Sequence, residues 1–193
     1  MGGREEFLQI WQQHVTRPGS EKLVDWLDHK TDFFTAPAST RFHGACEGGL
    51  CMHSLNVYHA LHDTFFTEGD SEETFAICAL LHDLCKANYY KPGTRNVKNE
   101  ATGQWEKVPS YSVEDLFPYG HGEKSVFLIE RFMKLHIEEA VAIRWHMGGF
   151  DDAARGGCFA ISEAYDKYPL AVKLHIADLE ATYLMEHRPS AVH

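Results

Sequence analysis

A chain of 193 residues, 44% of them hydrophobic, is long enough to bury a full core as one domain, residues 1–193. Its formal net charge of −10 supplies little of the extended basic face that long nucleic acids require, so we expect no such partner. No apolar run approaches the ~20 residues that span a bilayer, and the first residues lack a signal-peptide core. These features predict a cytoplasmic protein without a membrane partner.

The hydrophobic pattern predicts helices along most of the chain, because apolar residues recur at the spacing of one buried helical face. Breakers such as Pro18-Gly19 and N-capping residues such as Ser71 mark the helix ends. Residues 33–49 are expected to form a loop. The predicted helices are two within residues 4–30, then 50–66, 71–86, 121–133, 137–146 and 169–185.

One segment interrupts the helical pattern. Residues 94–98 and 104–108 flank a turn sequence and predict a β-hairpin at about residues 94–112. Five basic residues and two acidic ones lie between positions 84 and 107, a local charge of +3 (Lys86, Lys91, Arg95, Lys98 and Lys107 against Glu100 and Glu106). The hairpin is either a solvated surface element or a basic lid that meets a phosphate substrate.

Six histidine and aspartate residues stand at five positions that are spaced far enough apart in the sequence to come from different helices: His53, the adjacent pair His82 and Asp83, His121, His146 and Asp178. Imidazole and carboxylate groups together suit one or two divalent cations. A second His-Asp pair, His62-Asp63, lies next to a breaker stretch and has the context of an ordinary helix end. The alternative for His82 and Asp83 is likewise a polar helix terminus. His175, one turn before Asp178, is a candidate hydrogen-bond partner of the site.

These segments resemble the HD-domain superfamily of metal-dependent phosphohydrolases, in the branch with the order His…His-Asp…His…His…Asp. Residues 41–45 and 162–164 are also similar to HD-type 3′–5′ exoribonucleases, and similar uncharacterised proteins are carried by bacteria and their prophages. The resemblance covers roughly residues 35–185 and implies an all-α HD-domain helical bundle with the hairpin as an insertion and the N-terminal helices packed on it. The matching segments are 48–57, 80–86, 120–125, 144–148 and 174–178.

Six ligands exceed what one ion takes while leaving a position open, so two ions are expected, with a single ion as the alternative. The predicted division gives one ion His53, His82, Asp83 and Asp178, and the other Asp83, His121 and His146. Asp83 bridges because a carboxylate has two oxygens. The residues leave the metal open among Mn, Fe, Co, Ni, Zn and Mg.

The expected function is hydrolysis of a phosphoester in a small phosphorylated substrate: a nucleotide, a cyclic nucleotide or a short oligonucleotide. Asp83 and Lys86 are the predicted catalytic residues, with Lys86 contacting the phosphoryl group. Arg41 and His43, through the exoribonuclease resemblance, and Lys91 and Arg95 of the hairpin are further candidates for substrate contact. A di-iron HD-type oxygenase and a non-catalytic HD interaction module are the alternatives, and oxygen dependence separates the first of these from a hydrolase. The oligomeric state is not predicted.

Overall fold

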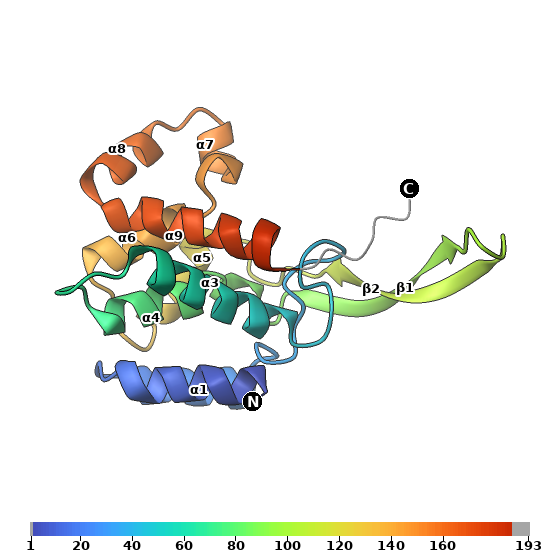
Figure 1. Ribbon diagram of the computed structural model, residues 1–193, viewed down its shortest axis with the longest axis horizontal. Helices are drawn as coiled ribbons and strands as arrows, with labels where there is room; N and C mark the ends of the chain where they lie inside the picture. Colours follow the sequence, from blue (N-terminus) through green and yellow to red (C-terminus); the bar gives the residue numbers. More distant parts are fainter. Residues whose placement is uncertain (1, 187–193) are drawn as a thin grey trace.

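The computed structural model describes residues 2–186 of the chain (Figure 1). Within them the protein is mostly helical and has one two-stranded antiparallel sheet, which confirms the expectation of a helical fold with a hairpin insertion. The helices are α1 (Gly3–His14), α2 (Ser20–Lys30), α3 (Gly49–Phe65), α4 (Glu72–Leu81), α5 (Gly122–Glu130), α6 (Ile137–Trp145), α7 (Asp152–Arg155), α8 (Ala160–Lys167) and α9 (Pro169–Glu180).

The helix α4 forms the centre of the core. Its residues from Thr74 to Leu81 are all buried, as expected for a helix that is apolar on every side. Ser71 begins it by accepting a hydrogen bond from the backbone N–H of Thr74, at 3.2 Å. Helix α3 packs on α4 and α9, α6 packs on α9, and α1 lies across α3 and α4 (Figure 1). The end of α4 therefore delivers the residues that follow it to the middle of the molecule.

The predicted helix 71–86 was wrong at its carboxyl end. Regular α-helix stops at Leu81, Asp83 leaves the helical region with φ −101° and ψ 20°, and Leu84–Lys86 form a single 3₁₀ turn. The backbone N–H of Cys85 donates to the Ser125 hydroxyl of α5 at 3.0 Å. That hydrogen bond takes the place of the next one in the helix, so a contact from a distant segment ends α4 where no breaker stands in the sequence.

The last predicted helix also departs from regularity. Helix α9 is regular from Pro169 to Glu180, and the chain then widens into a π-helical segment over Ala181–Met185. Two short helices, α7 and α8, lie between α6 and α9, where the hydrophobic pattern predicted none.

The hairpin is longer than predicted and extends away from the helices. Its strands are β1 (Tyr90–Lys98) and β2 (Trp105–Val113), paired from Tyr90 with Val113 to Lys98 with Trp105. The ribbon is mostly exposed and projects from the helical body (Figure 1), and its base is held by Tyr90, whose hydroxyl donates to the Ala38 carbonyl at 3.2 Å. The hairpin in this structure is therefore a solvent-exposed surface element and does not cover the helical body as a closed lid would.

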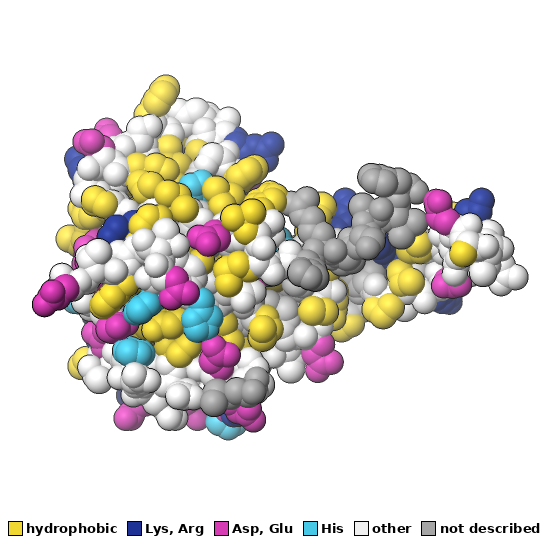
Figure 2. Space-filling model, in the orientation of Figure 1, with side chains coloured by type: hydrophobic (Ala, Val, Ile, Leu, Met, Phe, Trp, Pro, Cys, Tyr) yellow, Lys and Arg dark blue, Asp and Glu magenta, His cyan; other side chains and the backbone are white. Residues whose placement is uncertain are grey.

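Histidines outside the predicted ligand set pair with surface carboxylates. On the face drawn in Figure 2, histidine and acidic side chains gather near α1 and α3. His59 lies 2.7 Å from Glu6, and His62 lies 3.3 Å from Glu72. No helix in residues 2–186 combines the length and the apolar character needed to cross a membrane.

Candidate metal centre

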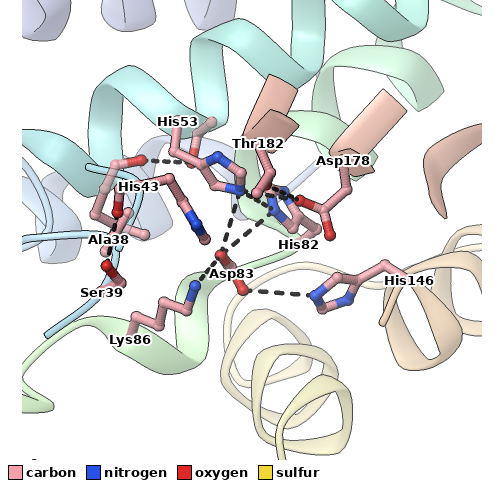
Figure 3. A network of polar contacts seen from close by, with 12 residues as sticks. Ala38, Ser39, His43, His53, His82, Asp83, Lys86, His146, Asp178 and Thr182 are labelled. Carbon is pink, nitrogen blue, oxygen red and sulfur yellow. Dashed lines mark hydrogen bonds and ion pairs between the residues drawn. The ribbon is translucent and has the colours of Figure 1, made fainter. Parts of the chain in front are cut away.

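The structure brings all six predicted ligands together in one cluster at the centre of the helices, and Figure 3 shows several of them pointing at Asp83. His53, His82, Asp83 and His146 are at most 1% exposed. Buried polar side chains of this kind require partners, and here the partners are one another. The six come from the first turns of α3 (His53), the end of α4 (His82 and Asp83), the start of α5 (His121), the end of α6 (His146) and the last turn of α9 (Asp178).

Two glycines permit the close packing that places these histidines. A Cβ on Gly122 would come within 2.3 Å of the Arg144 carbonyl, so only glycine allows α5 to lie against α6 at this point. Gly148 has φ 56°, and a Cβ there would meet the His175 ring. That space lets His175 contact the His146 carbonyl oxygen at 2.6 Å through Nδ1, so His175 supports the segment that carries a ligand.

The two oxygens of Asp83 face different histidines. Oδ1 lies 2.9 Å from His121 Nε2 and 3.5 Å from His146 Nε2. Oδ2 lies 3.6 Å from His53 Nε2 and 3.5 Å from His82 Nε2. A carboxylate placed in this way can contribute one oxygen to each of two neighbouring cation sites.

The ring hydrogen bonds point the free lone pairs of the histidines into the cluster. Nδ1 of His82 contacts the Ala79 carbonyl oxygen at 2.8 Å, and Nδ1 of His146 contacts that of Ile143 at 2.7 Å. A carbonyl oxygen only accepts, so each Nδ1 carries the proton and each Nε2 of a neutral ring presents a lone pair.

Those lone pairs lack partners of the right kind. His82 Nε2 lies 3.2 Å from His53 Nε2, so two nitrogens face one another. His146 Nε2 is buried and has no hydrogen-bond partner among the residues that the structure describes. A shared cation, or a proton in its absence, removes both problems. The donor set therefore fits a divalent metal, with His53, His82, Asp83, His121, His146 and Asp178 as the residues that would hold it.

Two of the ligand histidines favour positive charge. Burial disfavours the imidazolium of His53, but hydrogen bonds to Asp178 and Glu186 outweigh it and raise its pKa to about 9. For His121, burial again opposes the charge, while Cys85 and Asp83 raise its pKa to about 10. A divalent cation that replaces these protons would be stabilised by the same carboxylates.

The charges around the centre do not balance once the histidines are neutral, as metal ligation requires. Three carboxylates lie in or beside the cluster: Asp83, Asp178 and Glu186. Burial acts to raise the pKa of each, but the positively charged and hydrogen-bonding partners outweigh burial, so each pKa lies below its ordinary value. Lys86 is the ammonium beside them, with Nζ 2.7 Å from Asp83 Oδ2, and Asp83 raises its pKa although burial opposes this. With neutral histidines, the excess of two negative charges matches one divalent ion.

The residues predicted to contact substrate lie in different places. Lys86 reaches the cluster, and the ring of His43 lies 5.1 Å from that of His53. Burial, with the positive charges of His53 and Lys86, lowers the pKa of His43 to about 4, so this ring is neutral. Arg41 is exposed beside Phe42. Lys91 pairs with Glu114 at 3.3 Å on the hairpin, and Arg95 is exposed farther along it, so neither contacts the centre.

Two residues beside the ligands were missed by the sequence analysis. Glu186 Oε1 lies 2.8 Å from His53 Nδ1 and accepts from the Asn56 amide at 3.2 Å. The sulfur of Cys85 lies 3.3 Å from His121 Nδ1. Cys85 stands two positions after Asp83, which is a local signal. Glu186 has no such signal, because the π-helical segment before it decides where its side chain points.

A cavity of about 400 Å³ opens beside the cluster. Its inner end is formed by Cys85, Lys86 and His121, and its outer wall by residues that include Tyr89, Asp115, Phe150 and Asp152. Of the residues predicted to bind substrate, Lys86 is the one that lines this cavity. A molecule seated there would lie next to the candidate metal ligands.

Comparison with models of protein families gives no match to the chain, and the curated proteins and the solved structures yield no similar protein either. Function is therefore inferred from the buried His/Asp cluster, which has the composition to hold a metal ion, and from the cavity beside it.

Proposed function

We propose that this protein is a metal-dependent phosphohydrolase of the HD type that cleaves a phosphoester in a small substrate such as a nucleotide. The observation that carries the proposal is Asp83, buried between two pairs of histidine Nε2 atoms, with Lys86 beside it and a cavity alongside. The order of ligands along the chain agrees with the resemblance to that superfamily.

In this proposal, one ion would be held by His53, His82, Asp83 and Asp178, and the other by Asp83, His121 and His146. Bound divalent ions would act as Lewis acids on the phosphoryl group and lower the pKa of a water molecule. The Asp83 carboxylate, whose two oxygens face different histidines, would contribute to both positions. Lys86 places an ammonium at the inner end of the cavity, where it can contact a phosphoryl oxygen.

Charge balance supports a phosphate substrate. Protein groups leave an excess of two negative charges at the centre, so two divalent ions would leave an excess of two positive charges. A phosphomonoester dianion carries the opposite charge of the same size. A single bound ion would leave the centre neutral and give less attraction for such a dianion.

The test combines metal analysis with hydrolysis. The protein is stripped with a chelator, reloaded with Mn²⁺, Co²⁺, Ni²⁺ or Mg²⁺, and assayed under nitrogen against phosphomonoesters, nucleotides, cyclic dinucleotides and short single strands. Phosphate release that needs metal and disappears in Asp83→Ala supports the proposal. Absence of phosphoester cleavage with bound metal contradicts it, and a reaction that needs iron and O₂ would instead favour the oxygenase alternative.

The number of ions is tested separately. His121→Ala combined with His146→Ala should preferentially lose the second ion, because both residues belong to the same proposed site. Metal content that these substitutions leave unchanged would contradict the dinuclear assignment.

A further inference from the structure

We propose that the cavity beside the centre selects a substrate with a single phosphate and an uncharged, planar organic part, a nucleoside monophosphate in chemical class, and excludes nucleoside triphosphates. This inference rests on the proposed function and adds the identity of the substrate class. It is carried by the size of the cavity, its aromatic lining and the signs of the charges along its wall.

The size of the cavity suits one nucleoside. Its volume of about 400 Å³ lies near the lower end of the range for small-molecule sites, roughly 300–1,000 Å³. The inner end, at Lys86 and His121, adjoins the candidate metal ligands, so a phosphoryl group there would direct the rest of the molecule into the cavity.

The basic groups of the cavity are already paired. Lys124 is 6% exposed, and its Nζ donates to Asp115 at 2.7 Å. Lys86 faces Asp83. Arg144, behind the wall, lies 2.5 Å from Glu123 and 2.8 Å from Asp151, so one guanidinium serves two carboxylates.

The acidic groups exceed the basic ones away from the metal end. Asp115, Glu123, Asp151 and Asp152 line the cavity, whereas Lys124 and Arg144 are the cations that pair with them. Asp152 is exposed and has no ion-pair partner within residues 2–186. The wall therefore carries an excess of two negative charges, and a β- or γ-phosphate that extended along it would be repelled.

Uncharged rings meet a more favourable surface. Phe150 lines the cavity and is 56% exposed, so part of its ring surface is available for contact with a base. Met147 and Tyr89 add apolar contact. A planar, uncharged base can occupy this space without the electrostatic repulsion that a further phosphate would meet there.

The experiment measures kcat/KM of the metal-loaded protein for AMP, ADP and ATP and for the corresponding cytosine nucleotides. Free metal is held constant, because triphosphates chelate it. We expect monophosphates to be preferred over triphosphates by at least about tenfold. Asp152→Lys should reduce that preference about tenfold, whereas the control Asp166→Lys, an equal charge change on the exposed side of α8, should leave it unchanged.

Equilibrium binding of AMP and ATP, measured by calorimetry, gives a readout that does not depend on turnover. The inference is supported if AMP binds more tightly than ATP and if Asp152→Lys reduces the ratio of the two affinities. This holds even where hydrolysis is absent. Phosphoester hydrolysis with equal or better use of ATP overturns the inference and leaves the proposed function in place. AMP that is bound but never cleaved contradicts the proposed function alone.

Discussion

At the scale of single residues, Asp83 and Lys86 are adjacent in space but differ in what they can do. Asp83 has two oxygens that face four histidines, and Lys86 contacts one of those oxygens at 2.7 Å. A protonated ammonium is no metal ligand, yet it can contact a phosphoryl oxygen. Substitutions of these two residues therefore distinguish a loss of metal binding from a loss of turnover.

Lys86→Ala should leave folding and metal content nearly intact and lower turnover by about 10–1000-fold, since it removes a donor to the developing negative charge. Asp83→Ala should lose metal and activity together. Metal analysis and initial rates on the same preparations check both. Wild-type turnover in Lys86→Ala would show that the lysine only balances the charge of Asp83.

Glu186 should act as a positioning residue for His53. Its carboxylate contacts Nδ1 at 2.8 Å and so holds the ring with Nε2 toward the cluster. Glu186→Ala should weaken the affinity for Co²⁺ or Zn²⁺ by about 10–100-fold, the usual cost of losing such a partner. Glu186→Gln keeps an accepting oxygen and should restore most of that affinity.

The control for this prediction is Glu180→Ala at the end of α9, whose carboxylate contacts Thr64 at 3.3 Å. Its metal affinity should equal that of the wild type. Calorimetric titration of the stripped protein measures all three variants. Metal affinities equal to that of the wild type in all three variants would show that packing alone orients His53.

At the scale of elements, helix ends position two of the histidines. His82 and His146 are the C-caps of α4 and α6, and each Nδ1 contacts the carbonyl three residues earlier. Carbonyl groups in the last turn of a helix lack partners within it, so each ring satisfies one of them. The same bond sets the ring orientation and the tautomer that leaves Nε2 free.

The hairpin should be dispensable for folding and for metal binding. Replacement of residues 94–109 by Asn-Gly joins the paired residues Gly93 and Ser110 through a two-residue turn. Because the removed strands are mostly exposed, the free energy of unfolding should change by less than about 1 kcal/mol.

Urea denaturation and metal analysis check the shortened hairpin. Tyr90→Phe serves as a companion variant, since it removes the hydrogen bond to Ala38 and should cost about 0.5–1.5 kcal/mol. A loss of turnover in the shortened protein, with metal retained, would show that the hairpin closes over the substrate.

At the scale of the whole molecule, Arg17 joins the N-terminal helices to the bundle. It contacts Glu139 of α6 at 2.5 Å and Glu73 of α4 at 3.2 Å, and the Glu139 side chain is fully buried. Arg17→Ala leaves that carboxylate without its cation and should destabilise the protein by about 3–5 kcal/mol. Arg4→Ala, which breaks the more exposed pair with Asp28, should destabilise the protein far less. Urea denaturation measures both, and similar losses would contradict this ranking.

Glu73 makes stability depend on pH. Burial raises its pKa, but the backbone N–H of Thr16 and the guanidinium of Arg17 lower it below the ordinary value of 4.5. The folded pKa is below the unfolded one, so the stabilisation is present above pH 4.5 and is lost as the pH falls through the folded value. The free energy of unfolding should thus fall more steeply on acidification in the wild type than in Glu73→Gln. Urea denaturation of both proteins at several pH values across this range measures the dependence. Equal slopes of unfolding free energy against pH in the two proteins would contradict this prediction.

The sequence by itself determined the helical class, the hairpin and the six residues that meet at the centre. The helical class and the hairpin follow from short-range regularities, which are the period of apolar residues and the turn residues. The choice of the six residues among the histidines and aspartates follows from the chemistry of His and Asp together with the resemblance to the HD-domain superfamily. Its errors lie at element ends, as in the predicted helix to Lys86 that stops at Leu81, and in the two short helices α7 and α8, which it did not predict.

Only the tertiary structure decided the end of α4, the direction of the hairpin, the contact of Glu186 with His53 and the acidic wall of the cavity. Each of these depends on groups that are far apart in the chain, such as Cys85 with Ser125 or Arg144 with Glu123. Contacts of this kind leave no periodic trace in the sequence, because they depend on how whole helices pack and not on the residues within one turn.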